Sequence, residues 1–312
     1  MAAVNEFDLI EHAFRQQHSF QHALTRVPNG DDASVHDVPD GMQLAVSTDM
    51  SLAGVHWPHD FPLQFAARRA VNAALSDLAA MGAEACWIWV CAGLRDIRAG
   101  EAMGKGIALA LHGTGIELAG GDTVHASQDS LSVTVAGLVP VNGAMRRDAA
   151  AAGEEVWLCG RLGRAAMALE RWQQGERSDQ VVNDFANVVP MLAEGVALRE
   201  AGVRCCIDVS DGLLADAQHL ADDSGVGMDI ELPRIPCMNE LSQSLGNEAA
   251  ARLVLAGGED YGLLFTAPAT LHDSLKDIGV CIGACTGSAG EVVAWQNGVA
   301  AHVPQRGFDH FG

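Results

Sequence analysis

The sequence predicts an α/β or α+β protein that folds as two domains. The chain has 312 residues, which is enough for two domains of about 150 residues each. Hydrophobic residues make up 49% of the chain, as in globular proteins with a sizeable core. Segments with the alternation of a strand and segments with the periodicity of a helix follow one another along the chain.

Helices and strands interleave in the first half. Helices are expected at 6–24, 65–81 and near 99–111, where apolar residues recur along one face, and Gly82 is placed to end the second of them. Strands are expected at 42–47, 85–92 and 131–139, and a turn at Gly120–Thr123. The strand 85–92 has apolar side chains on both faces, with Trp87 and Trp89 on one of them. Both faces should therefore be covered, by helices or by a second subunit.

The boundary between the domains is expected in a stretch at 142–153 that is rich in Ala, Gly and charged residues. We place it after residue 147, which gives the domains 1–147 and 148–312. The second half then continues with a helix at 212–221 and with strands at 155–159, 204–209, 226–232 and 262–266.

Charge and composition exclude several classes of function. Against 40 acidic residues stand 19 Lys and Arg, and the formal charge of −21 disfavours nucleic acid and anionic membranes as partners. The N-terminal residues do not resemble a signal peptide, and no apolar run is long enough to span a membrane. The 8 Cys residues form no C-x-x-C pair, which is typical of reduced thiols in a reducing compartment, so a cytoplasmic location is expected.

Many of the acidic residues share one local setting. They lie at strand ends or turns, next to Gly, Ser or Thr, except for Asp77, which falls within a predicted helix. The set comprises Asp31, Asp32, Asp49, Asp77, Asp122, Asp208, Asp211, Glu259 and Asp260.

Clustered carboxylates need a cation. Two of them about 4 Å apart repel by about 1 kcal/mol in water and by about 4 kcal/mol near a protein surface. These acids therefore either point apart or converge on metal ions. Oxygen ligands favour Mg²⁺ or Ca²⁺ over zinc, and Mg²⁺ usually takes one or two carboxylates together with waters and substrate phosphates. Many acids would thus imply several ions and a polyphosphate substrate.

Each motif taken alone has a simpler explanation. The GDD sequence after Pro-Asn is typical of a turn, and Ser210 or Asp211 could cap the helix that begins near Gly212. The common phosphate-binding signatures are absent from the sequence: it contains no P-loop, no G-x-G-x-x-G at the start of a helix and no protein-kinase H-R-D or D-F-G set.

A resemblance to a known family rests on several motifs in order. They are GDDASV (30–35), STDM (47–50), GVHW (54–57), VNAALSDLAAMGA (71–83), GGDT (120–123), IDVSDGLLAD (207–216), GGEDYGLLF (257–265) and GFDHF (307–311). By these motifs the chain resembles the thiamine-monophosphate kinase family of the AIR synthetase superfamily over essentially its whole length.

The resemblance implies a fold and an activity. The implied fold is the AIR synthetase-like two-domain fold, in which the strands of the N-terminal domain build a β-barrel across a homodimer and a C-terminal α/β domain packs over it. The implied activity is the magnesium-dependent transfer of the γ-phosphoryl group of ATP to thiamine monophosphate, which yields thiamine diphosphate. The acceptor oxygen is already anionic, so direct in-line transfer without a general base or a phosphoenzyme is expected.

The resemblance also implies roles for individual residues. The implied contacts to thiamine monophosphate are His56, Glu259 and Phe308; an acid and an aromatic face suit the cationic thiamine rings. The implied contacts to ATP are Gly121, Asp122, Arg147 and Ser210. The residues expected to be catalytic are Asp122, Arg147 and Asp211. The implied ligands of several Mg²⁺ ions are Asp31, Asp32, Ser47, Thr48, Asp49, Asp77, Asp122, Asp208 and Asp211.

The sequence departs from the family pattern at several places. The family usually has Arg-x-Gly-Ala where this chain has Arg147 followed by Asp-Ala-Ala, so either Arg146 or Arg147 could contact ATP. A basic, proline-bearing loop of the family is replaced by NDFANVVPMLAEG at 183–195, and Gly104 stands where some relatives have an aromatic residue. Two alternatives stay open: another ATP-dependent enzyme of the same superfamily, or a non-catalytic dimer that binds divalent cations.

Overall fold

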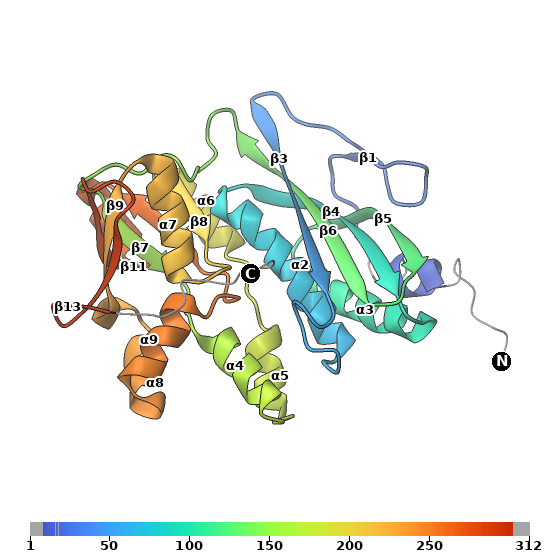
Figure 1. Ribbon diagram of the computed structural model, residues 1–312. Helices are drawn as coiled ribbons and strands as arrows, with labels where there is room; N and C mark the ends of the chain where they lie inside the picture. Colours follow the sequence, from blue (N-terminus) through green and yellow to red (C-terminus); the bar gives the residue numbers. More distant parts are fainter. Residues whose placement is uncertain (1–8, 16, 18, 302–312) are drawn as a thin grey trace. The chain divides into compact units, whose positions relative to one another are not determined.

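The computed structural model describes residues 9–15, 17 and 19–301 and divides the chain into two compact units (Figure 1). Unit 1 runs to Leu78 and continues over Ala83–Asn142, whereas unit 2 takes Ala79–Gly82 and everything from Gly143 onward. The division after Asn142 lies before the predicted one after residue 147. The boundary lies earlier because the Arg146 amide donates to the Arg204 carbonyl at 2.8 Å, which ties the segment around Arg146 to unit 2.

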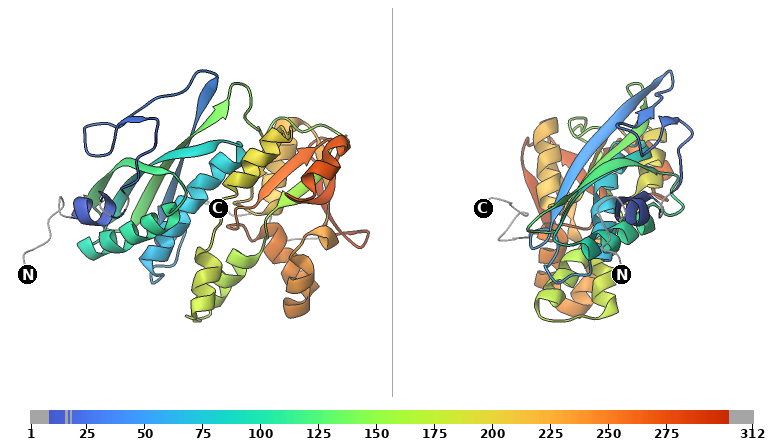
Figure 2. Two further views of the ribbon diagram at one scale, coloured as in Figure 1. Left: turned by 180° about the vertical axis from the view of Figure 1, so that it is seen from behind. Right: turned by 90° about the vertical axis from the view of Figure 1, so that its right-hand side faces the viewer.

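The mixed α/β content that the sequence predicts is confirmed in both units. Unit 1 is built on a four-stranded sheet in the order β3 (Met42–Leu52), β6 (Ser130–Pro140), β4 (Glu84–Leu94) and β5 (Glu117–His125). The long helices α2 (Leu63–Ala80) and α3 (Ile97–Leu111) run along one face of this sheet (Figure 1, Figure 2). Ile88 and Val133, which point to that face, are fully buried.

The other face of the sheet is partly covered by a short hairpin of the same chain. It consists of β1 (Thr25–Val27) and β2 (Val35–His36). Trp87 donates its indole hydrogen to the Thr25 hydroxyl at 2.9 Å, and Trp89 donates to the Ser34 hydroxyl at 3.0 Å. The prediction that both faces are covered is thus confirmed around Trp87, with helices on one face and this hairpin on the other, whereas Trp89 is half-buried. Cover by a second subunit stays a prediction.

The predicted helix at 6–24 is wrong over much of its length. A π-helical turn, η1 (Ile10–Arg15), is followed by irregular chain at 19–22 and then by β1. The His22 amide donates to the Glu117 carboxylate at 2.9 Å, and Leu24 packs into the cluster around Trp87. These contacts with distant strands outweigh the local periodicity.

The predicted turn at Gly120–Thr123 is also wrong, because these residues lie inside β5. The glycines serve a close approach between strands. A Cβ on Gly121 would come within 1.9 Å of the Val90 carbonyl oxygen, so only glycine allows β5 to pair with β4 here.

Unit 2 is built on a seven-stranded sheet in which only β12 and β9 pair in parallel. The strand order is β13 (Val299–Ala300), β12 (Val292–Gln296), β9 (Gly227–Glu231), β11 (Val280–Thr286), β7 (Glu155–Cys159), β10 (Leu263–Ala267) and β8 (Cys205–Asp208). Neighbouring residues of β10 enter different cores: Leu264 joins one cluster and Phe265 the other. Both faces of the sheet are therefore buried.

Helices supply both of these cores. The first cluster contains residues of α7 (Leu213–Ser224), α8 (Met238–Leu245) and α9 (Asn247–Ala256), and the second contains residues of α6 (Leu192–Glu200) and α10 (His272–Leu275). The remaining helices are α4 (Arg164–Gln173), α5 (Asp179–Ala186), η2 (Leu232–Arg234) and η3 (Ala269–Leu271). Among the described residues, none of the helices combines the length and the apolar character that a membrane span requires.

Candidate active site

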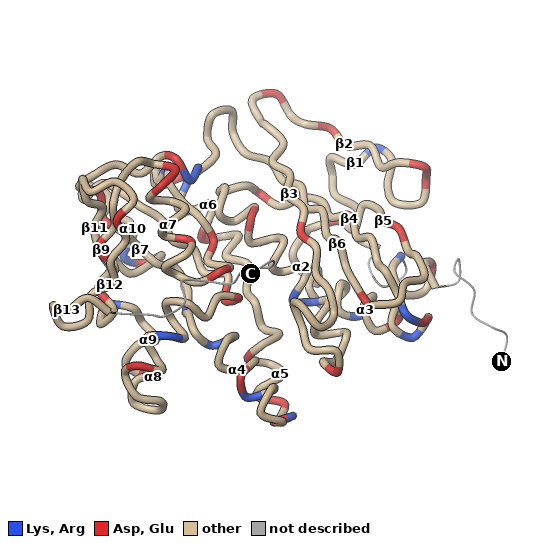
Figure 3. The backbone as a smooth tube through the Cα atoms, viewed as in Figure 1, with Lys and Arg blue, Asp and Glu red and all other residues tan. Residues whose placement is uncertain are grey.

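The predicted site draws residues from both units, and each half is described by itself. Figure 3 marks the acidic residues of the described chain in red. In unit 1, the acids and hydroxyls come from β3, α2, β5 and the loop between β1 and β2. In unit 2, they come from the end of β8, the start of α7 and the loop before β10.

The first group in unit 1 joins β3 to α2. The Ser47 hydroxyl donates a hydrogen bond of 2.5 Å to a carboxylate oxygen of Asp77. Asp49 follows Ser47 by two strand positions, so its side chain points to the same face of the sheet. Almost every residue around Asp77 on α2 is buried, whereas Asp77 itself keeps partial access to solvent. Ser47, Asp49 and Asp77 therefore form an oxygen-rich group on the helix-covered face.

Thr48 lies on the opposite face of β3. Its hydroxyl is hydrogen bonded to the Thr134 hydroxyl on β6. The side chain of Thr48 is thus not presented together with those of Ser47 and Asp77, and its role as a metal ligand stays a prediction.

Asp122 is also separated from Asp49 by the sheet. Strand register aligns Asp122 with Cys91, and Asp49 with Val133 and Val90 in the neighbouring row. Since successive rows of a sheet point to opposite faces, the two carboxylates point apart. Unit 1 alone therefore does not bring Asp122 together with Asp49 and Asp77.

Asp31 and Asp32 lie in the exposed loop between β1 and β2. The Asp31 carboxylate accepts a hydrogen bond from the adjacent Asp32 amide at 2.8 Å. The loop is anchored to β5, because the Asn29 amide donates to the Leu118 carbonyl at 3.4 Å. The turn that the GDD sequence predicts is present, and both carboxylates stay accessible to a cation.

His56 lies in the turn that follows β3. Its Nδ1 accepts a hydrogen bond from the Leu52 amide at 3.1 Å, so the neutral ring carries its hydrogen on Nε2. The turn is fixed from outside, because the Ala53 amide donates to the Asp129 carbonyl and the buried Asp129 carboxylate accepts from Arg95 at 2.7 Å. The ring of His56 is therefore held in a fixed position.

The half-site in unit 2 centres on Asp208, Asp211 and Asp216. Asp208 ends β8 and is buried, while Asp211 lies in the loop that leads into α7. The Asp211 amide donates to the Asp216 carboxylate at 3.1 Å. Ligand atoms of Asp211, Asp216 and His219 lie within 4.8 Å of one another.

The electrostatics of this half-site favour a cation. Burial, followed by the negative charges of Asp211 and Asp208, raises the pKa of Asp216 to about 8. A bound divalent cation would offset the burial and the repulsion that keep this carboxyl protonated. The donors are almost all carboxylate oxygens, which suits a hard cation such as Mg²⁺. The residues of unit 2 thus fit the metal that the family resemblance implies.

Asp216 and His219 were not among the predicted site residues. Asp216 falls in the first turn of α7, where helical side chains tilt back toward the N-terminus and so toward Asp211. The spacing of Asp211, Asp216 and His219 around a predicted helix start was a usable signal, because it places all three near one end of the helix.

Glu259 is held against the same loop in an uncommon backbone conformation. Glu259 and Tyr261 have φ angles of 68° and 56°, which non-glycine residues rarely adopt. Their amides donate to the carbonyls of Ser210 at 2.7 Å and Val209 at 2.9 Å. These bonds place Glu259 next to Ser210, so a predicted thiamine contact and a predicted ATP contact are neighbours within unit 2.

The two adjacent arginines differ in their partners. Arg146 donates to the Asp148 carboxylate at 2.8 Å, and this contact raises the pKa of Arg146 and lowers that of Asp148. Within the described chain, no ion pair is found for the Arg147 guanidinium, although its carbonyl accepts from Ser224 at 2.8 Å. Arg147 is therefore the better placed of the two for a phosphate.

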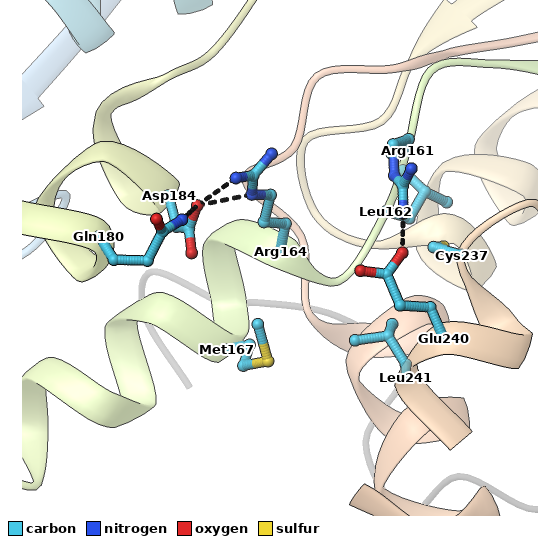
Figure 4. A pocket seen from close by; sticks show the side chains of 9 residues that line it. All are labelled: Arg161, Leu162, Arg164, Met167, Gln180, Asp184, Cys237, Glu240 and Leu241. Carbon is cyan, nitrogen blue, oxygen red and sulfur yellow. Dashed lines mark hydrogen bonds and ion pairs between the residues drawn. The ribbon is translucent and has the colours of Figure 1, made fainter. Parts of the chain in front are cut away.

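A separate pocket of about 260 Å³ lies beside α4 in unit 2 (Figure 4). Ion pairs join Arg161 to Glu240 and Arg164 to Asp184 at its wall. Since each guanidinium faces a carboxylate, this pocket presents no excess positive charge to a polyanion. None of the predicted site residues lines it.

Phe308 lies outside the described residues, so its contact with thiamine monophosphate stays a prediction. Ser210 and Gly121 lie in the loop before α7 and in β5, respectively.

Comparison with protein families finds two matching models. Residues 30–139 match the AIR synthase related protein N-terminal domain, and residues 151–278 match its C-terminal domain. Thiamine-monophosphate kinase of Escherichia coli K12 is 31% identical over 99% of both chains. The enzyme of the same name from Mycobacterium tuberculosis H37Rv is 31% identical over 84% of this chain and 80% of its own.

Solved structures agree with the sequence comparison. The crystal structure of thiamine-monophosphate kinase from Stenotrophomonas maltophilia K279a has a TM-score of 0.83 and 33% identity, over 96% of this chain and 98% of its own. A structure described as AaThiL complexed with AMPPCP and TMP has a TM-score of 0.76 at 24% identity, over 100% of this chain and 98% of its own, which supports the fold. The predicted AIR synthetase-like two-domain fold is therefore confirmed.

Proposed function

Since the chain belongs to the thiamine-monophosphate kinase family of AIR synthase-related proteins, we propose that it transfers the γ-phosphoryl group of ATP to thiamine monophosphate. The products would be ADP and thiamine diphosphate. The observation that carries the proposal is the similarity to a thiamine-monophosphate kinase at 31% identity over 99% of both chains. The carboxylates of both half-sites, which the motifs of the sequence predict, are consistent with it.

The chemistry demands positioning more than proton transfer. The attacking oxygen belongs to a phosphate that is already anionic, so no side chain has to remove a proton from it. The difficulty is the repulsion between two phosphate-bearing substrates, which fixed positive charge and correct alignment can overcome. We therefore extend the proposal to direct in-line transfer without a phosphoenzyme. Trapping of a radiolabelled phosphoprotein during turnover would contradict it.

Metal binding is part of the proposal. The residues that would hold Mg²⁺ in unit 1 are Asp31, Asp32, Ser47, Thr48, Asp49, Asp77 and Asp122, and those in unit 2 are Asp208 and Asp211. Bound Mg²⁺ would supply positive charge that neutralises phosphate oxygens of both substrates. Asp216 supports this group by accepting a hydrogen bond from the Asp211 amide.

The remaining predicted residues bind and orient the substrates. Arg147, whose guanidinium is not engaged by Asp148, contacts the phosphates of ATP, and Ser210 and Gly121 contact the nucleotide. Glu259 and Phe308 contact the cationic thiamine, as an acid and an aromatic face should. His56 forms a hydrogen bond to the monophosphate or to the ring. These assignments rest on the motif match and on the geometry of each half.

A homodimer is also part of the proposal. On the face of unit 1 away from the helices, large apolar side chains are exposed beyond the β1–β2 hairpin: Leu44 (49%), Val46 (58%), Met50 (57%) and Val124 (54%). Large apolar side chains exposed on one face of a sheet are typical of a protein–protein interface. Pairing of two copies through this face would build the predicted barrel. A cytoplasmic location stays a prediction from the sequence.

An assay with ATP, Mg²⁺ and thiamine monophosphate tests the function. Formation of thiamine diphosphate and ADP in equal amounts is the expected result. Turnover of ATP only with an amidine ribonucleotide would instead indicate an AIR synthetase activity, and cation binding without turnover would indicate a non-catalytic scaffold.

A further inference from the structure

The residue after Glu259 makes an unusual long-range contact. One carboxylate oxygen of Asp260 accepts from the Gly163 amide at 2.5 Å, and the other accepts from the Ala165 amide at 2.9 Å. Both amides belong to the N-terminus of α4, which has unpaired donors and a positive end of the helix dipole. Asp260 therefore caps a helix that begins almost a hundred residues earlier in the chain.

The start of α4 cannot cap itself. The N-cap position is occupied by Gly163, which has a φ of 84° and offers no side chain to the helix. A Cβ at this position would meet Leu241 at 3.0 Å and Leu253 at 3.3 Å. A local Ser or Asp is thus disfavoured by both backbone and packing, and the cap is supplied from the loop that carries Glu259.

The same loop is strained on both sides of Asp260. Glu259 and Tyr261 both adopt positive φ angles, a conformation that persists only where surrounding contacts enforce it. The contacts that enforce it are hydrogen bonds. The amides of Glu259 and Tyr261 donate to the carbonyls of Ser210 and Val209, and two amides at the start of α4 donate to the Asp260 carboxylate. The side chain of Asp260 thus reaches from the strained segment to a helix.

We propose that Asp260 is a positioning residue, which fixes Glu259 for its contact with thiamine monophosphate by anchoring the loop to the N-terminus of α4. This inference rests on the proposed function for the identity of the ligand. Both oxygens of the Asp260 carboxylate accept hydrogen bonds from the start of α4, so the role assigned to Asp260 involves no contact with the substrate.

The test compares Asp260→Ala with two further variants. Asp260→Asn keeps one acceptor oxygen and should retain part of the anchor. Asp96→Ala is the matched control, because Asp96 caps α3 in unit 1 in the same manner, accepting from Arg98 at 2.8 Å and Ala99 at 3.1 Å. Both Ala variants lose one helix cap, so both should lower the urea midpoint of unfolding to a similar extent.

Only the Asp260 variants should change the site. In Asp260→Ala, we expect KM for thiamine monophosphate to rise about tenfold, with a smaller rise for ATP, because a displaced Glu259 loses its alignment with the acceptor. Asp260→Asn should lie between wild type and Asp260→Ala, and Asp96→Ala should keep both KM values. An unchanged KM for thiamine monophosphate in Asp260→Ala would overturn the inference.

Hydrogen exchange separates this inference from the proposed function. The amides of Glu259 and Tyr261 should exchange faster in Asp260→Ala and not in Asp96→Ala. If the wild-type protein does not phosphorylate thiamine monophosphate, the proposed function fails, and the exchange measurement still decides the anchoring role. Unchanged protection of both amides in Asp260→Ala would show that Asp260 does not hold the loop.

Discussion

Ser47 on β3 and Asp77 on α2 are joined by a hydrogen bond of 2.5 Å, although 30 residues separate them in the chain. The Ser47 hydroxyl fixes the orientation of the Asp77 carboxylate. Asp77 is partly exposed, whereas its neighbours on the helix are buried. A helix residue with this setting has little reason to be acidic for packing. The contact instead suits a carboxylate that is held ready for a cation.

Replacement of Asp77 should remove activity without unfolding the protein. Asp77→Asn keeps the size of the side chain and its bond to Ser47 but removes the charge that holds Mg²⁺. We expect a loss of turnover of about 100-fold or more, comparable with the removal of one preorganised electrostatic contact. Steady-state kinetics at saturating Mg²⁺ and circular dichroism provide the measurement. Asp40→Asn, at an exposed turn, is the control and should retain full activity.

The two adjacent arginines should behave differently. Arg147→Ala removes a guanidinium that has no ion pair among the described residues, and we expect KM for ATP to rise about tenfold, as for the loss of one charge-assisted hydrogen bond. Arg146→Ala removes an exposed ion pair with Asp148 and should change KM for ATP by less than about twofold. Equal effects of the two substitutions would show that the assignment of ATP binding to Arg147 is incorrect.

The pKa of Asp216 predicts how the metal-free protein responds to pH. The folded protein keeps a proton on Asp216 up to a pH of about 8, whereas an unfolded Asp releases it near a pH of about 3.9. Between these values the folded state binds more protons than the unfolded state, so the contribution of Asp216 to stability falls as the pH rises. His219, Asp208 and Asp211 are the titratable groups that face it or act on it.

Urea unfolding in EDTA, at pH 5 and at pH 9, measures this effect. Asp216→Asn cannot ionise, so we expect the variant to be more stable than wild type at pH 9 and to differ less from it at pH 5. Addition of Mg²⁺ at pH 9 should stabilise wild type and so narrow the difference in stability between wild type and Asp216→Asn. A constant difference between the two proteins at both pH values would contradict the assigned pKa.

The exposed apolar face of unit 1 should mediate the homodimer. Val46→Glu places a charge on this face, and we expect it to shift the protein to monomers in light scattering after size exclusion. Cys91 is exposed on the same face, in the strand row of Met50, so its alkylation by iodoacetamide should be faster in Val46→Glu than in wild type.

Val299→Glu is the matched control for this experiment. Val299 is 69% exposed on β13 of unit 2, so the substitution adds the same charge away from the proposed interface. It should leave unchanged both the mass of the protein in light scattering and the rate at which Cys91 is labelled. A dimer that survives Val46→Glu would place the interface elsewhere. The buried thiols of Cys159, Cys205 and Cys285, whose pKa values burial raises to about 11, 11 and 12, should stay unlabelled in every folded variant.

The sequence by itself determined the elements whose signals are local. The helix expected at 65–81 is observed at Leu63–Ala80, and the strand expected at 155–159 is β7, because periodicity and end residues act over a few positions. It also determined the family and the acidic residues of its motifs, since each motif is a short contiguous stretch. None of these predictions depended on which distant residues contact one another in the fold.

Only the tertiary structure decided what depends on distant contacts. It ended the expected helix at 6–24 through the bond from His22 to Glu117, and it kept Gly120–Thr123 in a strand because β5 lies so close to β4. It placed Asp122 and Asp49 on opposite faces, since strand register is fixed by pairing partners rather than by sequence neighbours.

The same holds for the half-site in unit 2. The structure added Asp216 beside Asp211. It also joined Asp260 to a helix that starts almost a hundred residues earlier. Hydrogen bonds and charge interactions act through space, so residues far apart in the chain acquire their roles only when folding brings them within a few ångströms of one another.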